Sequence, residues 1–145
     1  MGVTAAKLLQ PQPRPTAAWL LAVVTLAAVA GMSAIWAGAA SLTGGSASWM
    51  CLVVALDAVL LLHLAGQSAG SRRVAWALAI TLLTVLAAAA LIAAAKIGVG
   101  MGLRPAASLG RMSLNLIILY WQANLNWIDL LWLIAGLVLA GRLAR

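Results

Sequence analysis

The chain has 145 residues, of which 66% are hydrophobic and 8% charged, and its nine basic and two acidic side chains give a net charge of +7. A soluble domain is about half apolar and about a quarter charged, so this composition excludes a water-soluble globular protein and predicts an all-α integral membrane protein. The basic residues lie at the margins of apolar runs, where anionic lipid head groups favour them, so we expect a lipid bilayer and no nucleic acid as partner.

The first residues differ in composition from everything that follows. Three prolines occupy alternate positions over 11–15, beside Lys7 and Arg14. Because proline resists regular helix, residues 1–16 are predicted to form a polar, Pro-rich cytoplasmic tail. Residues 17–145 are predicted to form a single membrane domain.

The first predicted span covers residues 17–40, a run without charge. At about 1.5 Å per residue it is long enough to cross a bilayer core of about 30 Å. A secretory signal has an apolar core of only about 7–15 residues, so we expect a retained span and not a signal peptide. Trp19 and Trp36 bracket this run at the spacing of the two interfacial aromatic belts.

The next two predicted spans cover residues 48–66 and 74–95. The uncharged turn before the second span is short, so the first two helices are expected to run antiparallel. The connection between the second and third spans contains Arg72 and Arg73, which indicates the cytoplasmic side of the membrane.

The last part of the chain is predicted to hold an amphipathic interfacial helix over residues 106–123 and a fourth span over residues 126–141. On a helical projection of about 100° per residue, a set of polar side chains falls within about 60°. These are Ser108, Arg111, Asn115, Gln122, Asn126 and Asp129. The alternative layout makes residues 106–122 a fifth span, which would bury Arg111 and expel the C-terminus.

The four-span layout gives an orientation. It puts six basic residues inside (Lys7, Arg14, Arg72, Arg73, Arg142 and Arg145) and three outside (Lys96, Arg104 and Arg111). This asymmetry agrees with the positive-inside rule. We therefore expect a multi-pass protein of a bacterial inner membrane with both termini in the cytoplasm.

Small residues are predicted to make the contacts between helices, because lipid tails are as apolar as leucine and hydrophobicity alone does not pair membrane helices. The candidate packing residues are Gly31, Gly38, Ala90, Ala94, Gly136 and Ala140. They either close a compact four-helix bundle or leave one seam for another subunit or a second copy.

Asp57 lies near the middle of the second predicted span. Placing a charge there costs free energy, so an ionisable residue at this depth is taken as a candidate functional residue by default. Three roles stay open: a neutral carboxyl hydrogen-bonded to Thr81 or Thr84, a pair with a basic group, or proton or cation handling. His63 is about 120° around the helix from Asp57, so we expect no direct relay between them. His63 is expected near the cytoplasmic interface.

A second polar group is expected at the outer end of the bundle. Lys96 and Asp129 are predicted to approach each other there and could pair as a structural clamp. The stripe of Arg111, Asn115, Gln122 and Asn126 is interpreted as the solvated face of the interfacial helix, or as the lining of a polar cavity or a docking face for a partner.

Catalytic and metal-binding patterns are missing from the sequence. No phosphate-binding loop, zinc-protease or serine-hydrolase motif occurs, and the single cysteine and single histidine provide no disulfide, zinc or two-histidine haem site. We expect no enzyme, metal or cofactor. The leading prediction is a non-catalytic subunit or accessory component of a larger membrane complex, such as a transporter. The alternatives are a transporter or channel component that uses Asp57, and a lipid-interacting protein.

Overall fold

The computed structural model describes residues 18–102 and 104–145 of the chain. Within these residues the chain forms six α-helices and no strand. They are α2 (Ala18–Thr43), α3 (Met50–Leu64), α4 (Ser71–Gly100), α5 (Pro105–Leu109), α6 (Leu114–Asn124) and α7 (Trp127–Leu143). The all-helical prediction is confirmed for this part of the chain, and the predicted tail over residues 1–16 lies outside it.

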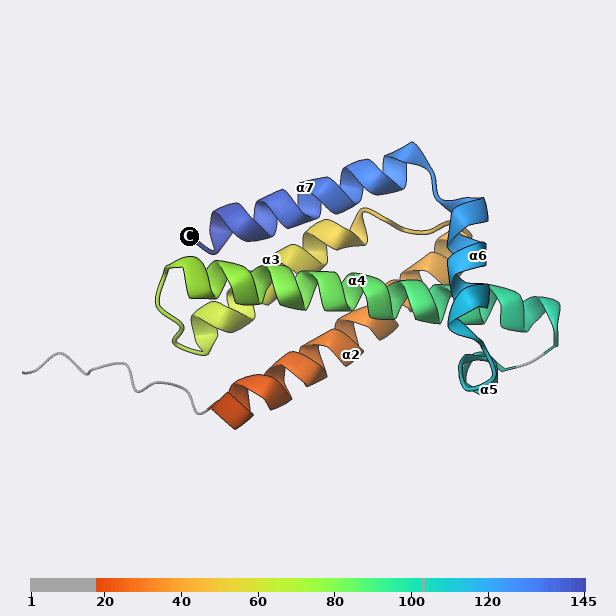
Figure 1. Cartoon of the computed structure of the whole chain (residues 1–145), viewed down its shortest axis with the longest axis horizontal. Helices are drawn as coiled ribbons and strands as arrows, with labels where there is room; N and C mark the ends of the chain where they lie inside the picture. Colours follow the sequence, from red (N-terminus) through yellow and green to blue (C-terminus); the bar gives the residue numbers. More distant parts are fainter. Residues whose placement is uncertain (1–17, 103) are drawn as a thin grey trace, which may run out of the picture.

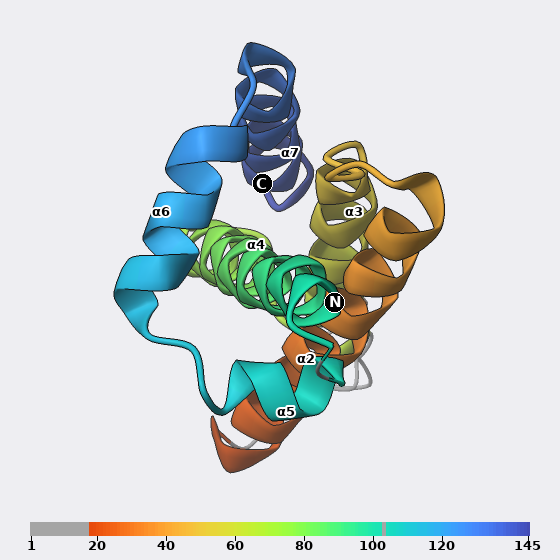
Figure 2. The ribbon, with the colours of Figure 1, turned by 90° about the vertical axis from the view of Figure 1, so that its right-hand side faces the viewer.

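Helix α4 is central and contacts each of the other described helices. Figure 1 shows α2, α3, α4 and α7 running along the long axis of the molecule, whereas α6 crosses one end of this group. In the end-on view, α2, α3, α5, α6 and α7 surround α4 (Figure 2). Because α3 also packs against α7, the four long-axis helices form one bundle.

Glycine ends three of these helices. Gly44 follows α2 with φ +73°, Gly66 follows α3 with φ +70°, and Gly102 follows α4 with φ +67°. A residue without Cβ enters this left-handed region without steric penalty, so the chain leaves the helix and reverses there. No proline interrupts α2, α3 or α4 between these points.

Two of the described helices are long and apolar enough to cross a membrane, namely residues Trp19–Thr43 of α2 and all 30 residues of α4. A third crossing results if α6 and α7, which meet at a bend of 108°, count as one broken span. Helix α3 has 15 residues and is about 22 Å long, which is less than a bilayer core of about 30 Å. Length and composition therefore support two or three of the four predicted spans.

The helix predicted over residues 106–123 is interrupted. Between α5 and α6, Ser113 takes an extended backbone conformation, and its hydroxyl accepts a hydrogen bond from the Leu116 amide at 3.4 Å. This cap starts a new helix. A second extended stretch separates α6 from α7. The predicted polar stripe assumed one continuous helix, so its members do not share one face.

The core consists of two layers of small and branched side chains. The layer near the start of α2 contains Leu21, Ala55, Ala58, Leu62, Ala77, Ile80, Ala140 and Ala144. The layer near the end of α2 contains Trp36, Ala40, Ala47, Met50, Cys51, Val54, Ala88 and Ile92. Alanine lets the helix backbones approach closely, as is usual for helices packed within a membrane.

Gly136 lies at a close contact between two helices, α3 and α7. A Cβ added to Gly136 would overlap the Sγ atom of Cys51 and would lie 3.0 Å from the Cys51 carbonyl oxygen. Gly136 and Ala140 are both buried on α7. Of the candidate packing residues of α4, Ala94 is buried and Ala90 is partly buried.

The small-residue seam predicted for α2 does not face another helix of the described chain. Gly31 and Gly38 are exposed, and a Cβ at either position would meet no atom within 4 Å. Trp36 determines which side of α2 faces inward, because its indole is buried and Nε1 donates to the Ser46 carbonyl oxygen at 2.9 Å. The two glycines lie about 140° and 160° around the helix from Trp36 and therefore face outward.

Candidate functional site

Asp57 lies at the middle of α3 and is partly buried. It borders the outward face of the helix, where Val53, Leu56 and Leu60 are exposed. Among the described residues, no side chain or backbone group hydrogen-bonds or ion-pairs with the Asp57 carboxyl. The fold thus leaves this carboxyl at the edge of an apolar surface, and no group of residues 18–102 or 104–145 satisfies it.

The threonines predicted to satisfy Asp57 have other partners. Thr81 and Thr84 are buried in α4, and their hydroxyls donate to the carbonyl oxygens of Ala77 and Ile80, each at 2.8 Å. A threonine within a helix often bonds to the carbonyl four residues earlier, which removes its donor from a neighbouring helix. The predicted hydrogen bond to Asp57 is therefore not formed.

His63 lies in the last turn of α3 and is exposed. The end of α3 lies at the same end of the bundle as the start of α4 and the C-terminus (Figure 1). His63 and Asp57 are not brought together.

Lys96 and Asp129 hold the same segment, residues 44–48, which we call the 44–48 loop. The Lys96 ammonium donates to the Gly44 carbonyl oxygen at 2.8 Å. Asp129 Oδ1 accepts hydrogen bonds from the hydroxyls of Ser46, at 2.7 Å, and Ser48. The predicted direct pair between Lys96 and Asp129 is absent from the described residues, because each group is bound to the loop that lies between α2 and α3.

Asp129 also organises the start of α7. Its Oδ2 accepts from the Asn126 amide at 3.0 Å, and the Asn126 side chain reciprocates in a capping box. Such a box satisfies backbone amides that the helix leaves unpaired. One carboxylate therefore joins the first turn of α7 to the 44–48 loop.

The serines of this cluster were not predicted. Ser46 and Ser48 occur two positions apart in a turn that we interpreted only as a short connection. Their hydroxyls lie 2.8 Å apart and share the Asp129 carboxylate. Two features of the sequence could have indicated this cluster: the paired hydroxyls in an uncharged turn, and the Asp in the first turn of a later helix.

The remaining members of the predicted outer cluster are dispersed. Arg111 and Asn115 are exposed, Arg111 in the connection before α6 and Asn115 in its first turn. Gln122 is also exposed, but it lines a cavity to which Asp129 contributes. Of the predicted stripe, only Gln122 and Asp129 therefore meet at one cavity.

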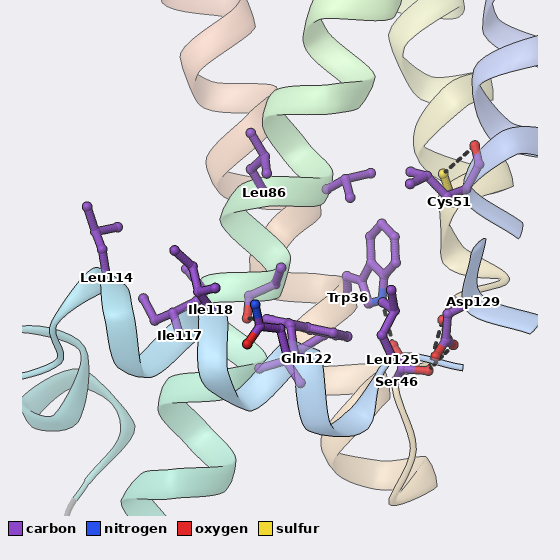
Figure 3. Close-up of a pocket in the computed structure, with 17 residues that line it drawn as sticks. Trp36, Ser46, Cys51, Leu86, Leu114, Ile117, Ile118, Gln122, Leu125 and Asp129 are labelled. Carbon is purple, nitrogen blue, oxygen red and sulfur yellow. Dashed lines mark hydrogen bonds between the residues drawn. The ribbon is translucent and has the colours of Figure 1, made fainter. Parts of the chain in front are cut away.

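This cavity has a volume of about 620 Å³ and lies between α6, α4 and the neighbouring ends of α2, α3 and α7 (Figure 3). Its walls are almost entirely apolar, with Trp36, Cys51 and Leu133 on the bundle side. The Cys51 thiol is buried and lies 3.9 Å from the Leu133 carbonyl oxygen. Polar side chains of the 44–48 loop and Asp129 line one end.

The described residues contain no group of three or more His, Cys, Asp or Glu side chains that could hold a metal ion. Comparisons of the chain with models of protein families, with curated proteins and with solved structures found no match. The class that the fold and the site define is a helical protein with two or three candidate transmembrane helices.

Proposed function

We propose that this chain is a non-catalytic subunit of a larger membrane assembly in a bacterial inner membrane, with α2, α3, α4 and α7 crossing the bilayer and both ends in the cytoplasm. The arrangement of charges supports the orientation. The starts of α2 and α4 and the ends of α3 and α7 lie at the same end of the bundle (Figure 1). The described basic residues of this end are Arg72, Arg73, Arg142 and Arg145. Those of the other end are Lys96, Arg104 and Arg111, which agrees with the positive-inside rule.

The short helix α3 is compatible with this proposal. A helix shorter than the hydrocarbon core is accommodated by local thinning of the bilayer or by flanking residues that reach the interface. Trp49 precedes α3 and is exposed, as suits an interfacial anchor. Helix α3 packs against α4 and α7.

The observation that carries the proposal is the half-open, unpartnered carboxyl of Asp57. Moving an Asp to the centre of a membrane helix costs about 2.5–3.5 kcal/mol on insertion scales. The described chain offers Asp57 no hydrogen-bond donor. A donor from another subunit, seated on the face formed by Val53, Leu56 and Leu60, would offset that cost.

Photocrosslinking in the membranes of the native host tests this proposal. A benzophenone-bearing amino acid replaces Leu60, which is exposed beside Asp57 on α3. We expect a discrete protein adduct that mass spectrometry identifies, and we expect Asp57→Leu to abolish it because the polar anchor is lost. The matched control carries the same amino acid at Leu26, an exposed position of α2. Adducts to lipid alone from Leu60 would contradict the proposal.

Transport of protons or cations is the second candidate function, since an unpartnered intramembrane carboxylate suits it equally. The cavity of the described structure is not lined by Asp57, which leaves this candidate without a route from that space to the carboxyl. We therefore expect the chain alone, reconstituted in liposomes with a pH-sensitive dye, to carry no flux above protein-free vesicles. A flux that Asp57→Asn removes would establish transport instead.

A further inference from the structure

Helix α6 turns one side toward the bundle without being buried there. The residues of α6 and its C-terminal neighbour that line the cavity recur at helical spacing. They are Leu114, Ile117, Ile118, Trp121, Gln122 and Leu125. This three- and four-residue repeat is one face of a helix. Trp121 packs against the buried core. None of the 11 residues of α6 is buried, however, so the rest of its apolar face lines a space.

The polar contacts of α6 hold it at this distance. Its Trp121 Nε1 donates to the Ala89 carbonyl oxygen of α4 at 3.0 Å. The ring of Trp121 also meets Tyr120 edge to face, with centroids 5.6 Å apart. The hydrogen bond to Ala89 attaches α6 to α4 near one point, and the cavity extends along the rest of the same face.

The chemistry of the walls favours hydrocarbon over water. A buried water needs about two to four polar partners. The polar side chains of the cavity are the exposed Gln122 of α6 and those at the end where Asp129 meets the 44–48 loop. There the hydroxyls of Ser46 and Ser48 already donate to the Asp129 carboxylate. A cavity of about 620 Å³ also falls within the range of about 300–1,000 Å³ that is usual for small-molecule sites.

The opposite end of the cavity opens toward the apolar surface of the molecule. Leu86 of α4 and Leu114 of α6 both line the cavity and are 59% and 77% exposed. Figure 3 shows Leu114 far from Asp129, at the other end of the α6 face. The exposed Arg111 comes three residues before Leu114. The positive charge of Arg111 thus lies close in sequence to the apolar opening of the cavity at Leu114.

We propose that this cavity holds one acyl chain of an anionic phospholipid, which enters between Leu86 and Leu114 and extends along α6 toward Trp36. The phosphate remains outside, on the side of Arg111. The hydrocarbon chain fills the cavity and contacts its apolar walls. The basic side chain of Arg111 attracts the anionic head group, as basic residues at a membrane surface do. This inference does not depend on the proposed partner of Asp57.

A photoreactive lipid tests the position of the chain. Phosphatidylglycerol with a diazirine at the end of one acyl chain is incorporated into vesicles that hold the full-length protein. After illumination, mass spectrometry locates the adducts. We expect labelling of the bundle-side wall, at Trp36, Cys51 or Leu133, in addition to the outward-facing leucines. Labels confined to outward-facing positions would overturn the proposal.

Filling the cavity provides the matched pair of variants. Ala90→Phe inserts a ring into the α4 wall, and we expect it to reduce labelling of the bundle-side wall by about tenfold. Ala79→Phe is the control, because Ala79 is exposed on the same side of α4, outside the cavity. If Ala90→Phe does not fold, Ile118→Trp fills the space from the more exposed α6 side. Undiminished labelling of the bundle-side wall in a folded cavity-filling variant would refute the site.

The head group is tested separately with the same chain. Phosphatidylcholine and a free fatty acid, each with the terminal diazirine, replace phosphatidylglycerol in parallel vesicles. We expect phosphatidylglycerol to label the bundle-side wall most strongly and Arg111→Gln to remove its advantage over phosphatidylcholine. Equal labelling by all three lipids in the unaltered protein would refute the anionic head-group contact, and preferential labelling by the fatty acid would refute a phospholipid as the source of the chain.

Discussion

Gly136→Ala should lower the free energy of unfolding by about 2 kcal/mol, because overpacking a close contact forces the surrounding backbone to move. The added Cβ would overlap Cys51 Sγ and lie 3.0 Å from the Cys51 carbonyl oxygen, and a backbone atom cannot swing aside as a flexible side-chain end does. Helices α3 and α7 would have to separate at this point, although they pack against each other in the bundle. Titration of the protein in mixed micelles with dodecyl sulfate, followed by circular dichroism, measures the change.

The control for this substitution lies on α2. Gly31→Ala adds the same methyl group within a helix, but it meets no atom within 4 Å, so we expect a change within about 0.5 kcal/mol. Cys51→Ala removes the Sγ atom and should recover part of the loss in a double-mutant cycle. Equal effects of Gly136→Ala and Gly31→Ala would show that α3 and α7 are not in close contact.

Asp129→Ala is expected to cost about 2 kcal/mol of stability, because hydrogen bonds to a charged group contribute more than neutral ones. The substitution removes the acceptor of the Ser46 and Ser48 hydroxyls and of the Asn126 amide together. It therefore weakens the start of α7 and its attachment to the 44–48 loop in a single step. The same dodecyl sulfate titration reports the loss.

Two comparisons separate these contributions. Asn115→Ala changes an exposed polar residue of α6 and should leave the stability within about 0.5 kcal/mol. In the Asp129→Ala background, Ser46→Ala should cost less than in the unaltered protein, since the acceptor is already gone. Additive effects of Asp129→Ala and Ser46→Ala would contradict a shared hydrogen bond.

Much of the secondary structure follows from local rules. Long apolar runs without proline predict helices, and the helices α2, α3, α4 and α7 lie on the runs 17–40, 48–66, 74–95 and 126–141. The antiparallel order follows from short connections between them. The interruption between α5 and α6 was missed because a helical projection does not register that the Ser113 hydroxyl caps a new helix.

The composition of the chain determines that it is helical and apolar, because each run buries its own backbone hydrogen bonds and needs no partner to do so. Tertiary contacts determine which side of each helix faces inward. An all-apolar helix has no polar face to mark its outer side, so the inward burial of Trp36, the outward position of Gly31 and Gly38, and the attachment of Asp129 to Ser46 depend on the neighbours that each residue meets in space.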